Sequence, residues 1–564
     1  MRVLIWGGDS WANRGDEAVL AGTLASVKLH LPAAMVTVAS DRPDRTEARH
    51  QVAAVRRVSL GFLRELARAE LVLWGGGVLI QDASSRLFLA VQLLFLLACV
   101  GLRKPVMCFA QGVGPVNSKA IAWALLHVLK RLALITVRDD ESAERLRRMG
   151  VPGAVVTADP SFCLEPALLP AEGRRGRLPY IAVALRRWGH YQGGWRPVRW
   201  QALREGSRFD RFCVEVAAAL DRVQESVGVE VLFVPMCPGG DQHDDLVAER
   251  VRGLMRHPAS TLQEDLPLAE LKCLLGQTEL VVAMRSHAGM LAAGAGTPVV
   301  SIDYQGKGHA LMATLGMSGY CLNWDSVTAD RLTVTICDAV KNGQVIRERL
   351  CQRIPELQRL AGDNARLAAA LIADPKAARW ARAYDGTGRL DRLLRERRRV
   401  ALALLQPHPV ETVLDAGCGP GGYASAVQAA GACWIGVGTS AGMLALASTE
   451  GPVLAGSAIS LPVRDGAVSA LLAVGLADYL PEGPLTGFAR EAARVLACGG
   501  RAVVSCNTSR RGLGVGGLRT GEPVVSPAAL IQALASAGLN IEAEERLPGG
   551  RLSPDTLILL ARKP

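Results

Sequence analysis

Cationic side chains and a histidine follow three predicted strands near the middle of the 564-residue chain. Arg285 and His287 come directly after one of these strands and open a helix rich in small residues. Arg186 and Lys307 follow the other two, and we expect all four side chains to converge because parallel strands end at one sheet edge. Three cations at a helix N-terminus suit a small anion with phosphate and carboxylate groups, and a histidine suits acid catalysis. A structural role, as partners of carboxylates or helix ends, is the alternative for each.

Glycine-rich turns follow three predicted strands in the first 170 residues, at residues 7–8, 75–77 and 112–114. Glycine lets backbone N–H groups approach a ligand, and three such turns in one domain predict a binding cleft. In these turns we expect the following residues to bind a sugar: Asn13, Asp16, Glu17, Gly76, Gly77, Gln81, Asp82 and Gln111. For Asp16 and Glu17 the alternative is a cap on the following helix.

Short apolar segments alternate with helical patterns along the whole chain, which predicts α/β domains with parallel, doubly wound sheets. A Pro-, Gly- and Arg-rich stretch near residue 170 marks the first boundary. We therefore place one Rossmann-like domain at residues 1–168 and a second at residues 176–350. An Arg-rich helical linker at residues 351–400 then leads to a third Rossmann-like domain at residues 401–564.

Six motifs in the first 345 residues occur in the order found in bacterial polysaccharide pyruvyltransferases. They read NRGDEAVLAG, GGGVLIQD, AQGVGP, VRDDESAERLRRMGV, ADPSF and MRSHAGMLAAGAGTPVVSIDYQGKG. The chain most resembles the branch that pyruvylates cell-wall polysaccharide for S-layer anchoring. The resemblance implies a GT-B-like pair of Rossmann domains, phosphoenolpyruvate as donor, and a sugar or lipid-linked saccharide as acceptor. The product would be a ketal that bridges two sugar hydroxyls, and no metal is implied.

The same resemblance assigns roles to individual residues. Arg285 and His287 match the family's catalytic Arg-x-His motif, although Ser286 stands where leucine is common. Arg186 and Lys307 match substrate-binding cations. The histidine would protonate the methylene carbon of the donor or assist departure of phosphate.

Residues 413–421 read VLDAGCGPG and resemble motif I of class I S-adenosylmethionine-dependent methyltransferases. The similarity includes residues 383–385 and several later segments of the third domain. The resemblance implies a class I methyltransferase fold and S-adenosylmethionine as cofactor. The cofactor-binding residues would be Asp415, Gly417, Gly419 and Gly421.

Several polar anchors of that cofactor are missing from the third domain. Gly438 stands where an acidic residue normally grips the ribose, and Ser457 stands where an acid normally meets the adenine. Residues 467–469 and 476–479 also depart from the usual pattern. Loss of a charge-assisted ribose contact costs cofactor affinity. A domain without methyltransferase activity, such as a docking module, and an active methyltransferase are both open interpretations.

Composition restricts the remaining function classes. Apolar residues make up 49% of the chain and charged residues 21%, which excludes disorder as a description of the whole chain. The net charge of +11 suits an anionic substrate or a lipid surface, and no nucleic-acid-binding motif appears. Thirteen cysteines without a C-x-x-C pair argue against structural zinc and favour a reducing cytoplasm. No signal-like segment is found at the start, so a cytoplasmic location is expected.

Residues 87–102 are almost wholly apolar but too short for a helix that spans a bilayer. One interpretation is a helix buried against the sheet. The other is a membrane-facing helix with Arg86, Arg103 and Lys104 at its ends, which would allow peripheral contact with the inner face of the plasma membrane.

Two further function classes stay open. A GT-B glycosyltransferase would need a nucleotide-sugar site in the second domain, and the compact Arg, His and Lys cluster suits a smaller phospho-acid better. Alternatively, the chain is mainly a methyltransferase whose first 350 residues bind carbohydrate. The preferred function is pyruvyl transfer in envelope or exopolysaccharide synthesis.

Overall fold

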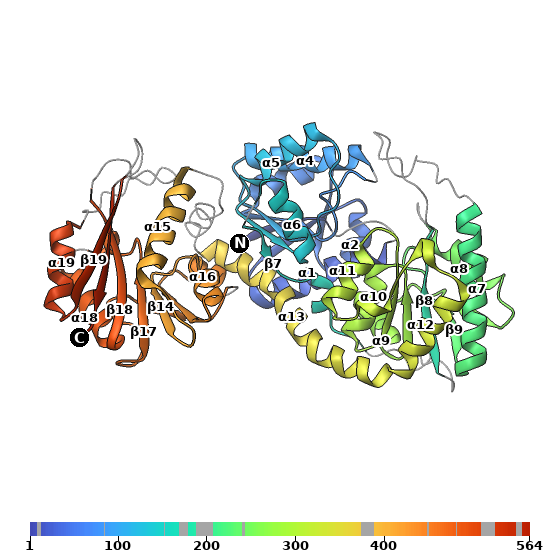
Figure 1. The fold of residues 1–564 in the computed structure, drawn as a ribbon. Helices are drawn as coiled ribbons and strands as arrows, with labels where there is room; N and C mark the ends of the chain where they lie inside the picture. The colour runs from blue at the N-terminus through green and yellow to red at the C-terminus, as the bar shows by residue number, and fades with distance from the viewer. Residues whose placement is uncertain are drawn as a thin grey trace. The chain divides into compact units, whose positions relative to one another are not determined.

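A computed structural model gives the fold of the chain as two compact units, Met1–Arg366 and Leu367–Pro564 (Figure 1). The structure describes residues 1–7, 13–83, 85–151, 153–167, 179–187, 207–239, 243–373, 389–447, 450–480, 482–508, 525–548 and 555–564. The predicted motif at residues 383–385 and Gly8 of the first glycine turn lie outside these ranges.

The first unit begins with a seven-stranded parallel sheet in the order β3-β2-β1-β4-β5-β6-β7. Its strands are β1 (Arg2–Trp6), β2 (Met35–Ser40), β3 (Ala53–Arg56), β4 (Leu71–Gly75), β5 (Val106–Gln111), β6 (Leu134–Val137) and β7 (Val155–Val156). The connecting helices are α1 (Arg14–His30), α2 (Pro43–His50), α3 (Leu60–Arg68), α4 (Arg86–Gly101), α5 (Lys119–Leu129) and α6 (Asp140–Arg148). Strands β4 and β5 are buried along their whole length, as a sheet covered by helices on both faces requires.

A six-stranded parallel sheet follows in the same unit, in the order β10-β9-β8-β11-β12-β13. Its strands are β8 (Tyr180–Ala184), β9 (Glu230–Phe233), β10 (Ala259–Thr261), β11 (Leu280–Ala283), β12 (Val299–Asp303) and β13 (Cys321–Asn323). Its helices are α7 (Ser207–Val227), α8 (Asp244–Arg252), α9 (Leu268–Gly276), α10 (Ser286–Gly294), α11 (Lys307–Thr314) and α12 (Ala329–Lys341). The two doubly wound sheets confirm the predicted GT-B-like pair of Rossmann domains.

Helix α13 (Gly343–Ala373) ties the second sheet back to the first. Its Leu357 and Ala361 are buried in the core around the second sheet. Its Asn364 is fully buried and accepts hydrogen bonds from Thr136 of β6 at 2.5 Å and from Thr157 at 2.9 Å. The first part of the expected linker therefore belongs to the first unit.

The second unit carries a seven-stranded sheet in the order β16-β15-β14-β17-β18-β20-β19. Its strands are β14 (Thr412–Ala416), β15 (Cys433–Gly438), β16 (Val453–Ala455), β17 (Val468–Ala473), β18 (Leu496–Asn507), β19 (Asn540–Leu547) and β20 (Thr556–Arg562). Only β20 runs antiparallel to its neighbours β18 and β19, and this topology confirms the predicted class I methyltransferase fold.

Helices cover both faces of this sheet. They are α15 (Arg389–Leu405), α16 (Ala424–Ala429), α17 (Ala441–Ala447), α18 (Glu482–Val495) and α19 (Pro527–Ser536). Val400, Ala401 and Leu405 of α15 are buried in the same core as Val413 of β14. The end of the expected linker is thus part of the second unit's core.

Candidate active-site cavity

The first unit contains a cavity of about 1120 Å³. Segments that follow the carboxyl ends of strands in both sheets line it, including the turns after β4, β5, β6, β8, β11 and β12. Parallel α/β sheets bind ligands at these strand ends. The cavity therefore lies where the sequence predicts a binding cleft.

His287 lies in the first turn of α10, on the cavity wall. Its Nε2 is 3.7 Å from Oδ2 of Asp159, and its Nδ1 faces Gly15 at the start of α1. A Cβ atom on Gly15 would come within 2.4 Å of that Nδ1. Only a residue without a side chain allows the imidazole this position.

Asp159 holds a buried negative charge beside the imidazole. It precedes the short 3-10 helix Pro160–Cys163, and it accepts a 2.8 Å hydrogen bond from Arg138, which follows β6. Burial by itself would raise the pKa of Asp159, but His287 and Arg138 outweigh it and hold the pKa well below its usual range. The carboxylate is therefore ionised at neutral pH. Neither Asp159 nor Arg138 was predicted as a site residue, although they belong to the motifs ADPSF and VRDDESAERLRRMGV.

Arg285 is held by a carboxylate that the sequence did not reveal. Its Nε and Nη2 donate hydrogen bonds of 2.8 and 2.6 Å to Asp244, the first residue of α8. Burial alone would lower the pKa of Arg285, but Asp244 raises it above its ordinary value. Arg285 also lines the cavity. Its Nε and Nη2 groups donate to Asp244.

Arg186 and Tyr304 form a second contact on the cavity wall. Arg186 donates a hydrogen bond to the Tyr304 hydroxyl, and its guanidinium lies 4.5 Å from the ring centroid. Burial would raise the pKa of Tyr304, but the nearby charges of Arg186, Lys307 and Arg285 lower it below its usual value. The wall is therefore strongly electropositive around this phenol.

Lys307 is the first residue of α11 and lines the same cavity. Burial lowers the pKa of this ammonium group. The loop before it is fixed by Asp303, whose carboxylate accepts hydrogen bonds of 2.8 Å from the N–H groups of Gly306 and Gly308. The structure thus brings all four predicted residues, Arg186, Arg285, His287 and Lys307, to one cavity.

The predicted sugar-binding residues divide into two groups. Those that line the cavity are Asn13, Asp16, Gly76, Gly77 and Gln81. Asn13 also caps α1, since its Oδ1 accepts a 3.0 Å hydrogen bond from Gly15 and its Nδ2 donates one of 2.9 Å to Asp16. Asp16 therefore does not provide the side-chain cap of α1, which was its alternative role.

Glu17, Asp82 and Gln111 do not line the cavity and have structural partners instead. Glu17 pairs with Arg49 at 3.0 Å. Asp82 accepts hydrogen bonds of 2.7 and 2.8 Å from the backbone before α5, and the Gln111 amide donates to the Gly77 carbonyl at 3.1 Å. Their positions give no support to direct contact with a sugar, because their polar groups hold the turns in place.

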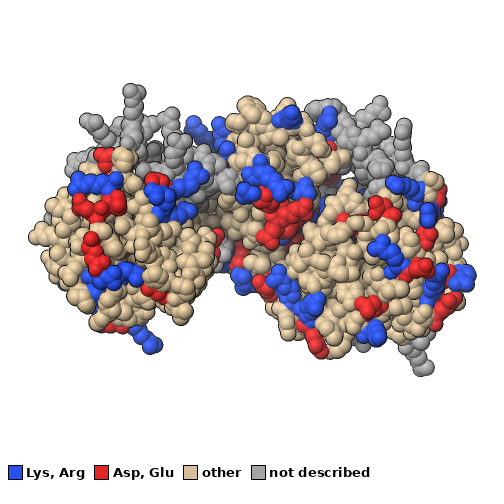
Figure 2. Space-filling model, viewed as in Figure 1, with Lys and Arg blue, Asp and Glu red and all other residues tan. Residues whose placement is uncertain are grey.

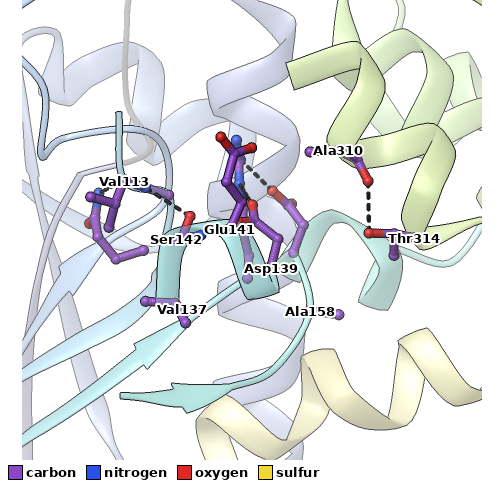
Figure 3. Close-up of polar contacts among 12 residues, drawn as sticks. Val113, Val137, Asp139, Glu141, Ser142, Ala158, Ala310 and Thr314 are labelled. Carbon is purple, nitrogen blue, oxygen red and sulfur yellow. Dashed lines mark hydrogen bonds and ion pairs between the residues drawn. The ribbon is translucent and has the colours of Figure 1, made fainter. Parts of the chain in front are cut away.

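The start of α6 forms another part of the wall, opposite α11 (Figure 3). Asp139 caps α6 by accepting a 2.7 Å hydrogen bond from the Ser142 N–H, and the Ser142 hydroxyl accepts one of 2.9 Å from the Val113 N–H. On α11, Thr314 donates to the Ala310 carbonyl at 2.9 Å. The Ser142 contact fixes the loop after β5. Together these groups give the cavity a polar side that was not predicted from the sequence.

In the second unit, the glycine turn after β14 has the predicted shape. Gly417, Gly419 and Gly421 have φ angles of 76°, 54° and 85°, the left-handed region that favours glycine. Asp415 is buried under this turn and accepts a 3.2 Å hydrogen bond from the Trp434 indole. Burial raises the pKa of Asp415 to about 7.

One expected anchor for S-adenosylmethionine is absent near this turn. At Gly438, where a ribose-binding acid is expected, a Cβ atom would meet the Leu444 side chain at 3.4 Å. A Cβ atom on Gly417 would lie 3.0 Å from Leu476, and one on Gly421 would lie 3.2 Å from Glu450. Gly417 is nevertheless exposed and Gly419 half-buried, so the turn itself stays open, and the feature that is missing is the charged ribose acceptor at position 438.

No cluster of three or more His, Cys, Asp or Glu side chains suited to a metal ion occurs in the part of the chain that the structure describes. The same ranges contain no helix with the length and apolar character needed to cross a bilayer.

Known proteins resemble both units. The second unit is similar in fold to a geranyl diphosphate C-methyltransferase from Streptomyces coelicolor, with 18% identity, a TM-score of 0.28, and coverage of 32% of this chain and 81% of that one. A methyltransferase from Methanosarcina mazei gives 15% identity, a TM-score of 0.26, and coverage of 28% and 93%. Residues 413–500 match the family described as "Methyltransferase domain".

The first unit matches proteins of polysaccharide synthesis. The amylovoran biosynthesis protein AmsJ of Erwinia amylovora is 22% identical over 420 residues, which cover 64% of this chain and 98% of AmsJ. Residues 13–306 match the family described as "Polysaccharide pyruvyl transferase". This match includes more than half of the sequence. Arg186, Arg285 and His287 lie within it, and Lys307 is the first residue beyond it. The chain therefore belongs to the polysaccharide pyruvyl transferase family.

Proposed function

We propose that the first unit transfers the pyruvyl group of phosphoenolpyruvate to two hydroxyls of a saccharide, as a ketal, during exopolysaccharide or envelope synthesis. The observation that carries this proposal is that Arg186, Arg285, His287 and Lys307 line one cavity, where the three cations all act on the Tyr304 phenol. Arg138 lines the same cavity but is paired with Asp159, as Arg285 is with Asp244. The positive charge of Arg186 and Lys307 beside these pairs suits a small donor that carries both phosphate and carboxylate.

Arg186 and Lys307 are the proposed anion-binding residues. Arg186 offers a planar guanidinium for two-point contact with carboxylate or phosphate, and Lys307 offers a compact charge at the start of α11. Arg285, anchored by Asp244, keeps a fixed positive charge beneath them. A bound trianion would also offset the mutual repulsion of these cations.

His287 is the proposed general acid. It donates a proton to the methylene carbon of the donor, C2 becomes cationic, and a sugar hydroxyl adds to C2 while returning its own proton to the imidazole. The C2–O bond to phosphate then breaks, phosphate leaves with the bonding electrons, and the second hydroxyl attacks C2 and gives its proton to the released phosphate. The products are one cyclic ketal and one inorganic phosphate. Asp159 would balance the charge of the protonated imidazole and keep its ring in place.

The acceptor saccharide is proposed to lie against Asn13, Asp16 and the turn at residues 76–77. These groups line the side of the cavity built by the first sheet and can form hydrogen bonds with sugar hydroxyls. AmsJ is by its name an amylovoran biosynthesis protein, which supports an exopolysaccharide repeat unit as acceptor. An S-layer-anchoring cell-wall polysaccharide and a lipid-linked precursor belong to the same chemical class.

A glycosyltransferase is the second candidate, because a paired-Rossmann cavity of this size could hold a nucleotide sugar. Calorimetric titration separates the two. Phosphoenolpyruvate is expected to bind to the wild type, with affinity reduced at least about tenfold in Lys307→Gln. Lys341→Gln, at the exposed end of α12, is the matched control. Tight binding of a nucleotide sugar without binding of phosphoenolpyruvate would favour the glycosyltransferase.

For the second unit we propose a methyltransferase fold that no longer binds S-adenosylmethionine effectively. The proposal rests on Gly438 and Ser457, which stand where acidic residues normally hold the ribose and the adenine. Titration of the full-length protein with S-adenosylmethionine is expected to give no binding at micromolar concentrations. Micromolar binding would favour the alternative, an active methyltransferase.

We also propose a cytoplasmic location, from the state of the cysteines and the identity of the proposed donor. All thirteen cysteines are free thiols, which suits a reducing compartment. Phosphoenolpyruvate is an intermediate of central metabolism and is available there.

A further inference from the structure

Helix α4 is apolar on the face that it presents to solvent as well as on the face that it buries. Leu89, Phe95 and Leu96 pack into the core. On the other side, Leu94 is 65% exposed and Leu97 is 46% exposed. A surface helix normally places polar residues outward, as the neighbouring α6 does with its glutamates and arginines. The outer face of α4 therefore lacks the composition of an ordinary water-facing surface.

The exposed apolar residues of α4 continue onto its neighbours α5 and α3. Helix α5 packs beside α4 and exposes Trp123 by 66%. Helix α3 is joined to α4 by the Phe62–Phe95 ring contact, and it exposes Leu63. We call this surface the apolar face; it comprises Leu60, Leu63, Val91, Leu94, Leu97, Leu102 and Trp123.

Positive charge predominates around α4 and α5, whereas α3 also carries Glu65, with Glu70 just after it. Residues 83–138 contain seven Lys or Arg residues and no Asp or Glu. Arg86 and Arg103 stand exposed at the two ends of α4, and Lys119 stands exposed at the start of α5. Figure 2 shows this end of the first unit as largely uncharged, with scattered Lys and Arg, whereas the rest of the visible surface mixes both signs. Apolar side chains bordered by cations match an anionic lipid surface.

We propose that the apolar face docks the protein onto a membrane with anionic head groups. A second copy of the chain is a poor occupant, because a two-fold contact would bring identical cationic borders together. A bilayer offers anionic head groups to Arg86, Arg103 and Lys119 and an apolar interior to Leu94 and Trp123. Tryptophan is well suited to this boundary, since its ring is apolar and its N–H is polar.

The same helix connects the proposed membrane contact with the cavity. Phe88 and Gln92 of α4 line the cavity wall. The Gln92 side chain accepts 3.0 Å hydrogen bonds from the indoles of Trp6 and Trp74, which fixes α4 against the sheet. Docking through Leu94 would thus hold the cavity within about two helical turns of the lipid surface. Under the proposed function, the acceptor would then be a saccharide carried on a membrane lipid.

Sedimentation with vesicles tests this proposal. Full-length protein should bind phosphatidylcholine vesicles that contain about one third phosphatidylglycerol, and should bind pure phosphatidylcholine vesicles much more weakly. Leu94→Asp combined with Trp123→Asp should reduce binding at least about tenfold, and Arg103→Gln about fivefold. Leu246→Asp combined with Val334→Asp is the matched control, because these apolar residues are exposed on α8 and α12, and it should bind like the wild type.

Two further measurements keep the outcomes distinct. Thermal melting shows whether each variant is folded, and size-exclusion chromatography reports the oligomeric state. Equal vesicle binding by the wild type and the Leu94→Asp, Trp123→Asp variant would overturn the proposal. The proposal would also be overturned if the wild type were a dimer that does not bind vesicles and the double variant were a monomer. Binding is measured without substrate, so its failure leaves pyruvyl transfer to a water-soluble acceptor unaffected.

Discussion

The carboxylate of Asp159 lies 3.7 Å from Nε2 of His287, in a position where it can balance a proton on the imidazole. The two residues come from opposite halves of the first unit, since Asp159 follows the first sheet and His287 begins a helix of the second. Arg138 holds Asp159 from the other side at 2.8 Å. The proposed acid is therefore assembled only when both domains are in place.

Removal of the imidazole should abolish most of the catalysis. His287→Ala is expected to lower kcat by about 10²–10⁴-fold, the usual contribution of a general acid. Phosphate release from phosphoenolpyruvate in the presence of a saccharide acceptor measures the effect. His257→Ala is the control, because His257 is a surface residue that pairs with Glu225. Full transfer by His287→Ala would contradict the assigned role.

Loss of charge at Asp159 should affect the rate more than substrate binding. Asp159→Asn keeps the shape of the side chain but removes the negative charge beside His287. We expect a lower kcat with little change in KM for phosphoenolpyruvate, and a pH–rate profile that differs from that of the wild type. Asp245→Asn, a half-exposed carboxylate on α8, is the control. An unchanged profile would indicate that Asp159 has only a structural role.

The contact between Gly15 and His287 gives a separate test of imidazole position. Gly15→Ala would place a Cβ atom 2.4 Å from Nδ1, so the ring must move. Activity should fall at least about tenfold, because small displacements at a reacting centre are costly. Gly61→Ala on α3 should leave activity unchanged, since its nearest neighbour would be 3.5 Å away. Equal activity of both variants would contradict the observed packing.

The buried pair of Arg285 and Asp244 should dominate the stability of this region. Arg285→Met leaves the Asp244 carboxylate without its bidentate partner, so the free energy of unfolding should fall by about 3–5 kcal/mol. Combining it with Asp244→Leu should restore part of the loss, because both charges of the pair are then gone while the Cys237 N–H loses its acceptor. Urea unfolding of the single and double variants measures this coupling. Additive losses would show that the pair is not coupled.

Asp415 should make the second unit less stable as pH rises. Its pKa of about 7 exceeds the ordinary value of 3.8, so the folded unit binds this proton more tightly than the unfolded chain does. Its contribution to stability is fully present below about pH 4 and is lost as pH rises to 7. Asp415→Asn should remove this slope, since the amide can still accept from Trp434. Calorimetry across this pH range measures the stability of the second unit. Leu471→Ala, in the core of that unit, identifies which thermal transition belongs to it. An identical slope in the variant would contradict the argument.

Sequence periodicity predicted the three parallel sheets because their central strands are continuous apolar runs with turns at their ends. It missed β3, β10, β13 and β16, which are short and lie at sheet edges, where partial exposure weakens the apolar pattern. It also missed β19 and the antiparallel β20 at the end of the third sheet. The linker was placed too broadly, since its Arg-rich helices each bury one face in a neighbouring core.

A residue's location at the cavity could be predicted where its place after a strand decides its position, while its role toward a substrate stays a prediction. His287 and Lys307 are examples, since both begin helices at the sheet edge. Prediction was less successful where a distant partner decides what a side chain does. Asp82 serves the backbone before α5, and Arg285 pairs with Asp244, which is 41 residues away in sequence. Such pairings depend on the packing of two elements and leave no local pattern.

The most direct test of pyruvyl transfer is to follow the carbon atoms of the donor. Full-length protein, phosphoenolpyruvate labelled with ¹³C at C2 and a saccharide acceptor would be analysed by NMR. The predicted result is a ketal carbon bonded to two sugar oxygens, formed in equal amount to inorganic phosphate and absent with His287→Ala. Phosphate release without the ketal signal, or sugar transfer from a nucleotide donor by the same cavity, would contradict the account.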